Sequence, residues 1–190
     1  MGGTFDPIHL GHLRAAESAC EALDLGEVLF VPSGTPPHRA DPSASALDRF
    51  AMVCLATAEN PRFVPSTLEL ERGGPSYTME TVAEIRAARP SDTLVLIVGS
   101  DAFPEMSGWR QAASLFASCE VAVVDRPGAE TDADLPAQPA FPDVRGIRRV
   151  SGSLPISASD VRRLAREGRS IRYLVPEPVA GFVAKRGLYR

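Results

Sequence analysis

The sequence has very little lysine, few cysteines and no long apolar run. Lys185 is the only lysine among 20 basic residues, so arginine carries nearly all of the positive charge. No stretch of about 18 consecutive apolar residues occurs, which argues against a membrane-spanning helix. No basic segment followed by an apolar one opens the chain in the manner of a secretion signal. We therefore expect a cytoplasmic protein that has no membrane partner.

The three cysteines, Cys20, Cys54 and Cys119, are odd in number and far apart in the sequence. Their spacing fits neither a disulfide framework nor a zinc site. We expect buried free thiols in a reducing compartment, and no metal site made by the protein's own side chains. The net charge of −4 and the absence of a basic block argue against nucleic acid as the main partner.

The length of 190 residues suits a single domain, 1–190, which can bury roughly 70% of its unfolded surface. Strand-like and helix-like segments alternate, which predicts an α/β fold: a mostly parallel sheet with helices on both faces. The unbroken apolar run 93–98 is typical of a central strand buried on both faces. Residues 129–146 are rich in proline, alanine and aspartate, and predict a surface insertion.

Hydrophobic periodicity predicts the order of the elements. We expect helices over 11–24, 45–59, 76–88, 111–116, 157–168 and 176–189, and strands over 27–32, 93–98, 119–124 and 147–150. We also expect a strand within 63–70 that Pro65 interrupts or edges. The second helix has an apolar stripe that we expect to face the core, made of Leu47, Phe50, Ala51, Cys54, Leu55 and Ala58.

The first dozen residues have the composition of a phosphate-binding turn that leads into a helix. Gly2 and Gly3 let the backbone approach a bulky anion, and successive N–H groups in such a turn can form a nest for phosphate oxygens. His9 and His12 share a face if the helix begins near Pro7. That face lies beside the positive end of the helix dipole. These residues together predict a polyphosphate site.

Two further stretches have side chains suited to nucleotide binding. Gly99 and Asp101 follow an apolar strand, at the edge where open α/β sheets bind ligands. An aspartate there suits a ribose diol, although it also fits a plain helix cap. Ser157 and Arg162 lie at a predicted helix N-terminus, which is either an anion site or an ordinary serine cap.

Taken in order, these motifs resemble the nicotinate-nucleotide adenylyltransferase family of H-x-G-H nucleotidyltransferases. The family implies a Rossmann-like nucleotidyltransferase fold. It also implies transfer of the adenylyl group of ATP to nicotinate mononucleotide, which gives nicotinate adenine dinucleotide and pyrophosphate in NAD biosynthesis. The family's Pro-Pro-His run normally continues with lysine, whereas Arg39 follows here. The matching stretches are 2–12, 36–38, 76–81, 99–103, Trp109, 126–128 and 156–162.

The resemblance implies the roles of the site residues. Tyr77 and Thr78 open a helix whose N–H groups suit the nicotinate carboxylate, and with no acid evident nearby we expect the acid to be preferred over the amide. Mg²⁺ is expected as a cofactor that is bound with ATP. The ATP side would comprise Gly3, Thr4, Phe5, His9, His12, Gly99, Asp101, Ser157 and Arg162, of which His9, His12 and Arg162 are catalytic. The nicotinate-nucleotide side would comprise His38, Arg39, Tyr77, Thr78, Trp109 and Arg126.

Three matters stay open at this stage. A sibling adenylyltransferase acting on nicotinamide mononucleotide or phosphopantetheine would share most of these motifs. A nucleotide-binding module without turnover is a second alternative, although both motif histidines are present. The sequence leaves a monomer and a homo-oligomer equally open.

The N-terminus departs from the expected pattern. Met1 directly precedes Gly2 and Gly3, although a glycine turn of this kind should follow a strand, which is typically about 5–6 residues long. We therefore expect the first strand to be missing from this chain, and a translation start placed too late is the favoured explanation. The alternative is a genuinely short form, in which another segment or chain fills the slot. Met1 should enter the sheet region, and the strand at 94–98 should show a gap or a substitute partner.

Overall fold

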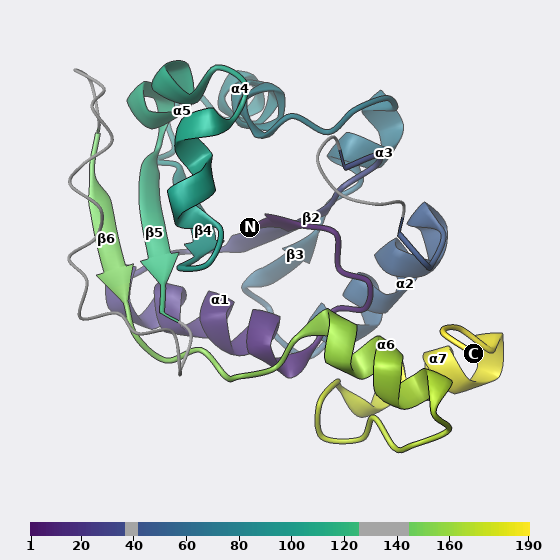
Figure 1. Ribbon diagram of the computed structural model, residues 1–190. Coiled ribbons are helices and arrows are strands. Elements are labelled where there is room, and N and C mark those ends of the chain that lie inside the picture. The colour runs from purple at the N-terminus through teal and green to yellow at the C-terminus, as the bar shows by residue number, and fades with distance from the viewer. Residues whose placement is uncertain (37–41, 126–144) are drawn as a thin grey trace.

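The computed structural model describes residues 1–36, 42–125 and 145–190. In these residues the strands form two parallel three-stranded sheets, in the orders β1-β2-β3 and β4-β5-β6 (Figure 1). The strands are β1 (Gly2–Gly3), β2 (Val28–Pro32), β3 (Phe63–Pro65), β4 (Val95–Gly99), β5 (Glu120–Val124) and β6 (Ile147–Val150).

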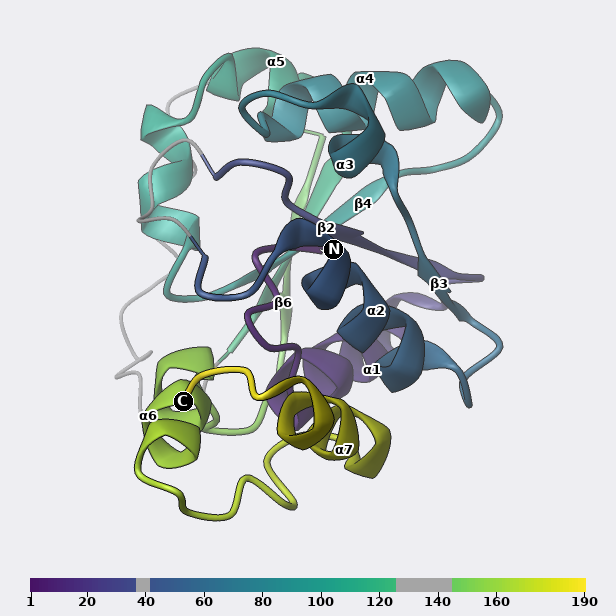
Figure 2. The ribbon, with the colours of Figure 1, turned by 90° about the vertical axis from the view of Figure 1, so that its right-hand side faces the viewer.

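The helices cover both faces of the strands, with α1 and α2 on one side and α4 and α5 on the other (Figure 2). This arrangement confirms the predicted Rossmann-like α/β fold. The helices are α1 (Leu10–Leu23), α2 (Ala46–Thr57), α3 (Leu68–Arg72), α4 (Thr78–Ala88), α5 (Ala112–Ser118), α6 (Ala158–Arg166) and α7 (Glu177–Arg186), with a 3₁₀ helix η1 (Phe103–Gly108). None of those helices is long and apolar enough to cross a membrane.

The strand β5 separates two hydrophobic cores. Successive side chains of a strand point to opposite faces, so Ala122 and Val124 join the core on the α1 side, whereas Val121 and Val123 join the core under α4 and α5. The prediction that 93–98 is the central strand is wrong for this sheet. β4 lies at the sheet edge, and its side chains alternate between the two cores as those of β5 do.

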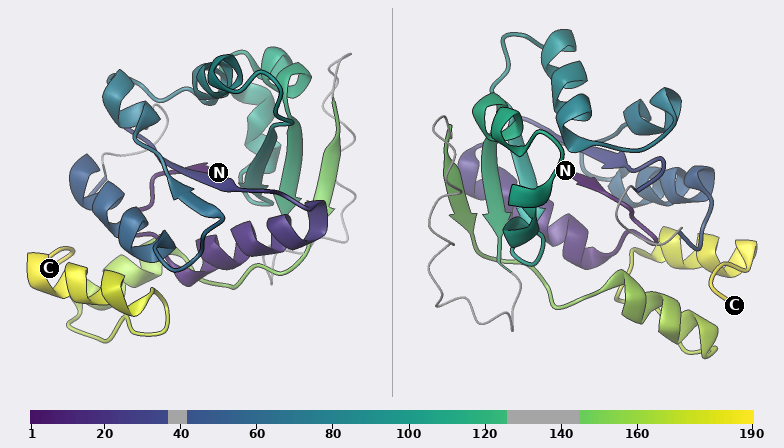
Figure 3. Two further views of the ribbon diagram at one scale, coloured as in Figure 1. Left: turned by 180° about the vertical axis from the view of Figure 1, so that it is seen from behind. Right: turned by 45° about the horizontal axis from the view of Figure 1, so that its top comes forward.

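The two sheets are separated by a gap between β2 and β4, where the N-terminus lies (Figures 1 and 3). The Met1 ammonium donates to the carbonyl oxygen of Leu29 at 2.8 Å, and the Val31 N–H donates to the Met1 carbonyl at 3.0 Å. Burial lowers the pKa of this α-amino group to about 6. A cavity of about 1160 Å³ lies along both β2 and β4. The expected entry of Met1 and the gap beside β4 are both confirmed.

The apolar stripe predicted for the second helix is wrong. Leu47 is 78% exposed and Leu55 is 37% exposed, so this face points towards solvent. The buried face of α2 instead carries Arg49, together with Met52, Val53 and Thr57. Arg49 can lie on the buried face of α2 because its guanidinium group donates hydrogen bonds to backbone carbonyls inside the fold.

The strand predicted within 63–70, with Pro65 at its edge, is confirmed as β3. β3 ends at Pro65, which has no N–H to continue a ladder, and α3 begins at Leu68. The predicted insertion 129–146 lies, up to residue 144, outside the residues that the structure describes.

We expect a short apolar extension ahead of Met1 to stabilise this chain. A strand of about five residues would pair with the backbone edges of β2 and β4. Each apolar side chain that it buries would contribute roughly 1.5–3 kcal/mol. Thermal unfolding should show a melting temperature that is higher by at least about 5 °C.

An extension of equal length made of glycine and serine is the matched control, and it should leave the melting temperature nearly unchanged. Equal melting of the two extended forms would show that the gap does not accept a strand.

The chain without an extension should show a pH-dependent stability. The pKa of its Met1 α-amino group is about 6 in the folded protein, below the ordinary value of 8.0. The unfolded chain therefore binds more protons between these values, and stability should rise from pH 6 to pH 8. Either extension should weaken this pH dependence.

Candidate active site

The loop between β1 and α1 is held in place by the ring of Phe5. Phe5 has a left-handed backbone, with φ of 50°, and its side chain is buried. Its ring meets the ring of His12 edge-on, with the centroids 5.1 Å apart. A Cβ atom on Gly3 would lie 3.1 Å from the Phe5 ring. Glycine at position 3 therefore makes room for this ring.

His9 and His12 close the N-terminus of α1 by bonding to each other's backbone. The His12 N–H donates to Nδ1 of His9 at 3.3 Å, and the His9 N–H donates to Nδ1 of His12 at 3.2 Å. Their rings stack with the centroids 3.6 Å apart. The helix begins at Leu10 and not near Pro7, so His9 is its N-cap. The prediction that the two rings lie together is confirmed.

These two hydrogen bonds determine the tautomer of each neutral imidazole. Because Nδ1 accepts a backbone N–H, the proton of the neutral ring is on Nε2. Both rings line the large cavity. The start of α1 can therefore present two Nε2–H donors beside the positive end of the helix, where an anion is favoured.

Gly11 allows a second loop to approach the histidine pair. A Cβ atom at this position would lie 3.0 Å from Nδ1 of His9 and 3.3 Å from the carbonyl oxygen of Leu154. Leu154 belongs to the segment that leads into α6. The glycine of the H-x-G-H motif thus brings the starts of α1 and α6 together.

At the start of α6, Ser157 is the N-cap and its Oγ accepts the N–H of Asp160 at 3.1 Å. Ser157 is thus a helix cap, and it also lines the cavity. Nη1 of Arg162 donates to the backbone carbonyl of Asp6 at 2.6 Å. This bond attaches the arginine of α6 to the loop after β1.

Arg49 is a residue of this region that sequence reasoning missed. Its side chain is 1% exposed, and it donates to the carbonyl oxygens of Thr4 at 2.8 Å and Gly34 at 3.2 Å. Burial lowers the pKa of its guanidinium group, and the negative charge of Asp6 opposes that shift. Arg49 thus links the loop after β1 to the loop after β2. In the sequence, Arg49 precedes Met52 by three positions and Val53 by four, which places all three on one helix face. This spacing could have indicated that Arg49 is buried.

Across the cavity, the end of β4 presents Gly99 and Asp101. The Ser100 N–H donates to the carbonyl oxygen of Val124 at 3.0 Å, which ties this turn to β5. The Asp101 residue is exposed to solvent. The predicted position at the carboxyl end of a strand is confirmed.

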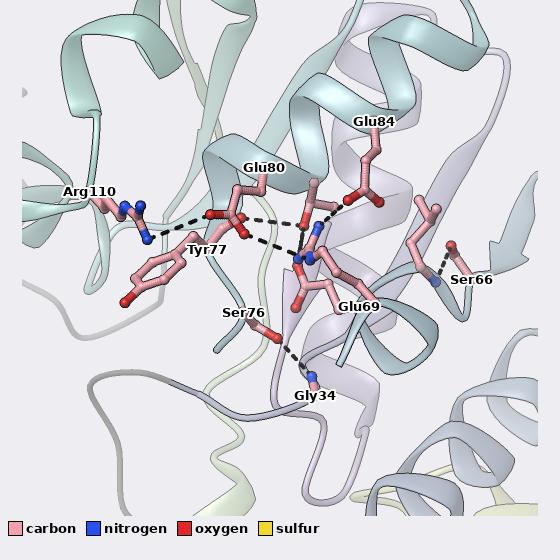
Figure 4. A network of polar contacts seen from close by, with 11 residues as sticks. Gly34, Ser66, Glu69, Ser76, Tyr77, Glu80, Glu84 and Arg110 are labelled. Carbon is pink, nitrogen blue, oxygen red and sulfur yellow. Dashed lines mark hydrogen bonds and ion pairs between the residues drawn. The ribbon is translucent and has the colours of Figure 1, made fainter. Parts of the chain in front are cut away.

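A second part of the cavity surrounds the start of α4 (Figure 4). Tyr77 is the N-cap of α4, and its own side chain makes no capping hydrogen bond. The guanidinium carbon of Arg110 lies 4.5 Å from the centre of the Tyr77 ring, and its Nη1 lies 3.6 Å from Oε1 of Glu80. The expectation that no acid lies nearby is wrong, because Glu80 is adjacent. Its charge is offset by Arg110 and by Arg72, whose Nε lies 3.8 Å away.

The loop after β2 is fastened to the same region. The Gly34 N–H donates to Oγ of Ser76 at 2.8 Å (Figure 4). A Cβ atom on Gly34 would lie 2.8 Å from the carbonyl oxygen of Glu69, so only glycine fits this crossing. The buried carboxylate of Glu69 accepts the Thr81 hydroxyl at 2.6 Å. These contacts connect α3 and α4 to the loop that Arg49 also holds.

The expected site residues within the described chain all line this one cavity. Three further expected residues, His38, Arg39 and Arg126, lie outside the described residues. Among the described residues no group of three or more His, Cys, Asp or Glu side chains is placed to hold a metal ion. The residues brought together are Gly3, Thr4, Phe5, His9, His12, Gly99, Asp101, Ser157, Arg162, Tyr77, Thr78 and Trp109.

Comparison with known proteins identifies the relatives of this chain. The sequence profile of the Cytidylyltransferase-like family matches residues 1–164. A Thermus thermophilus protein named "Probable nicotinate-nucleotide adenylyltransferase" is 45% identical, and the alignment covers all of this chain and 97% of that protein. A Geotalea uraniireducens protein of the same name is 42% identical over all of this chain and 96% of its own length.

A solved structure shares the fold at much lower sequence identity. It is the Plasmodium falciparum nicotinic acid mononucleotide adenylyltransferase complexed with NaAD. The TM-score is 0.82 at 17% identity, and the match covers 99% of this chain and 94% of that chain.

We expect Gly11→Ala to destabilise the protein by about 1–3 kcal/mol, the usual effect of overpacking. The added methyl group would press on the His9 ring and on the backbone at Leu154. Chemical denaturation of the purified variant measures this loss. Gly181→Ala is the matched control, since nothing lies within 4 Å of a Cβ there. Gly181 lies inside helix α7, where replacing glycine by alanine should raise the free energy of unfolding by about 0.5–1 kcal/mol. Similar effects of the two substitutions would contradict the close approach at Gly11.

Proposed function

We propose, since the chain belongs to the Cytidylyltransferase-like family and within it to the nicotinate-nucleotide adenylyltransferases, that it transfers the adenylyl group of ATP to nicotinate mononucleotide. A phosphate oxygen of the mononucleotide forms a bond to the α-phosphorus of ATP. The bond from that phosphorus to the bridging oxygen breaks, and pyrophosphate leaves with the electron pair. The product is nicotinate adenine dinucleotide, a precursor of NAD.

One observation carries the proposal: a glycine loop, two imidazole donors and an arginine converge on one large cavity. The attacking phosphate is already anionic at neutral pH, so the reaction needs neither a protein nucleophile nor a strong base. The protein has to align the two phosphates and neutralise charge that develops on the leaving group. The side chains gathered around the start of α1 suit both tasks.

On the ATP side, we assign the backbone of Gly3, Thr4 and Phe5 to the reacting phosphates. His9 and His12 would donate their Nε2–H groups to phosphate oxygens. A second group of residues would hold the rest of ATP: Gly99, Asp101, Ser157 and Arg162. Gly99 and Asp101 would bind the adenosine end, and Ser157 and Arg162 the β- and γ-phosphates.

On the other side, the nicotinate ring would lie near Tyr77, Thr78 and Trp109. The uncapped start of α4 offers backbone N–H groups to the carboxylate, and the indole of Trp109 offers a flat stacking surface. Arg110, which is already paired with Glu80, adds positive charge to this pocket. His38, Arg39 and Arg126 remain predicted contacts of the mononucleotide.

Mg²⁺ would arrive with the triphosphate, and it would supply positive charge that favours the departure of pyrophosphate. The reducing cytoplasm is the compartment we propose, because the three cysteines are free and Cys20 and Cys119 are buried. Burial raises the pKa of the Cys119 thiol to about 11, so it stays protonated and unreactive at neutral pH.

We expect His12→Ala to lower kcat by about 10²–10³, the usual scale for one donor that stabilises developing charge. The melting temperature should fall by only a few degrees, because His12 caps a helix at the wall of the cavity and is not a core residue. Steady-state assays of pyrophosphate release, with melting curves as the control, test this. Turnover at the wild-type rate in the folded variant would contradict the role of His12.

A substrate panel tests the function itself. With ATP present, the enzyme should form a dinucleotide from nicotinate mononucleotide with a kcat/KM at least about tenfold above that for nicotinamide mononucleotide, since an unpaired carboxylate-binding site discriminates strongly. Phosphopantetheine should give no product. Removal of Mg²⁺ by a chelator should stop the reaction.

The outcomes of this panel separate the alternatives. Preference for the amide or for phosphopantetheine would identify a sibling adenylyltransferase. Nucleotide binding without any product would identify a binding module. Equal kcat/KM for the acid and the amide would contradict the carboxylate pocket at α4 while leaving adenylyl transfer in place.

A further inference from the structure

The carboxylate of Asp6 joins three distant segments of the chain beneath the phosphate loop. Asp6 is only 4% exposed. It accepts the backbone N–H groups of Ser43 at 2.7 Å and Ala44 at 3.1 Å. It also accepts the hydroxyl of Tyr189, 183 positions away in sequence, at 2.8 Å. A buried carboxylate with three donors is held in one position.

Tyr189 reaches Asp6 because the chain reverses after α7. Gly187 ends that helix with φ of 64°, and Tyr189 itself has φ of 64°. A tyrosine in this left-handed region has an unfavourable backbone conformation. The ring is 8% exposed and belongs to the same core as Phe5 and Val161. The bond to Asp6 and the burial of the ring offset this backbone cost. The end of the chain lies beside α6 and α7 (Figures 1 and 2).

Arg162 is attached to the same aspartate. Its Nη1 donates to the backbone carbonyl of Asp6 at 2.6 Å and lies 4.0 Å from Oδ2 of that residue. Arg162 thus contacts Asp6 both at its backbone, through a hydrogen bond, and at its carboxylate, through an ion pair. The carboxylate that Tyr189 holds therefore lies beside the guanidinium group of Arg162.

We propose that Tyr189 is a positioning residue for adenylyl transfer: its hydroxyl fixes Asp6, and Asp6 in turn fixes Arg162 beside the ATP phosphates. The inference rests on the proposed function, because it takes Arg162 as a ligand of ATP. Tyr189 is not among the residues that line the cavity, so it would act on the substrates only through Asp6.

The phenol is well suited to this task. Burial and the adjacent Asp6 carboxylate raise the pKa of Tyr189 above its usual range. The hydroxyl therefore stays protonated, and so remains a proton donor, at neutral pH. A carboxylate that accepts a phenol O–H forms a charge-assisted bond, which is stronger than a neutral one.

The first test compares Tyr189→Phe with Tyr173→Phe. Both tyrosines have φ of 64°, but Tyr173 is 86% exposed, which makes it a matched control for loss of a hydroxyl. Loss of a hydrogen bond to a charged group predicts that Tyr189→Phe lowers kcat/KM for ATP by about tenfold or more. KM for nicotinate mononucleotide should stay within about twofold, and Tyr173→Phe should match the wild type.

The second test is a double-mutant cycle with Arg162→Lys, which removes the guanidinium fork. If Tyr189 acts through Arg162, then Tyr189→Phe should change kcat/KM by less than about twofold in the Arg162→Lys background. Equal losses in both backgrounds would overturn the inference, and so would wild-type kinetics of Tyr189→Phe. Melting curves separate a loss of folding from a loss of positioning. Absence of dinucleotide formation by the wild type would instead overturn the proposed function.

Discussion

The reciprocal bonds between two histidines and the start of one helix are the constraint on which the rest of the site depends. A helix N-terminus leaves backbone N–H groups that need acceptors. Here Nδ1 of His9 and of His12 supply them, which places the protons of the neutral rings on Nε2. Gly11 is small because the His9 ring and the chain at Leu154 both approach it, and the Phe5 ring packs edge-on against His12. The contacts around the start of α1 thus determine the tautomers of His9 and His12 and the stacking of their rings. They also determine how closely the segment that leads into α6 approaches.

Buried charges hold the loops that carry these groups. A buried ion is tolerated only where hydrogen bonds replace its water. The two Nη groups of Arg49 meet this condition through the carbonyls of Thr4 and Gly34, and Asp6 meets it through two N–H groups and the Tyr189 hydroxyl. Arg49 thus attaches α2 to both loops, and Asp6 attaches the loop after β1 to the C-terminal turn. These groups are therefore part of the site, although neither ion needs to contact a substrate.

Local chemistry made much of the site predictable from the sequence. The pairing of His9 with His12, the helix start at Thr78 and the acid after β4 follow from spacing, caps and strand ends. The failures have non-local causes. The buried face of α2 was misjudged because Arg49 finds its partners on other loops. The contact between Asp6 and Tyr189 spans 183 positions, and no periodicity signals it. The apolar residues of β4 predict a buried strand. Its position at a sheet edge depends on which other strands pair with it, and the sequence of β4 does not contain that information.

The divided sheet explains why side-chain anchors matter so much here. Among the described strands, β1 (Gly2–Gly3), which leads into the loop before α1, pairs with β2 alone, and both of its residues line the cavity that continues into the site. A strand paired on both sides would hold its loop through backbone hydrogen bonds. With one side unpaired, the position of the loop depends more on Phe5, on Arg49 at Thr4 and on the carboxylate of Asp6. Tyr189 and Arg162 both attach to Asp6, so the C-terminal turn supplies part of the rigidity that the sheet does not supply to this loop.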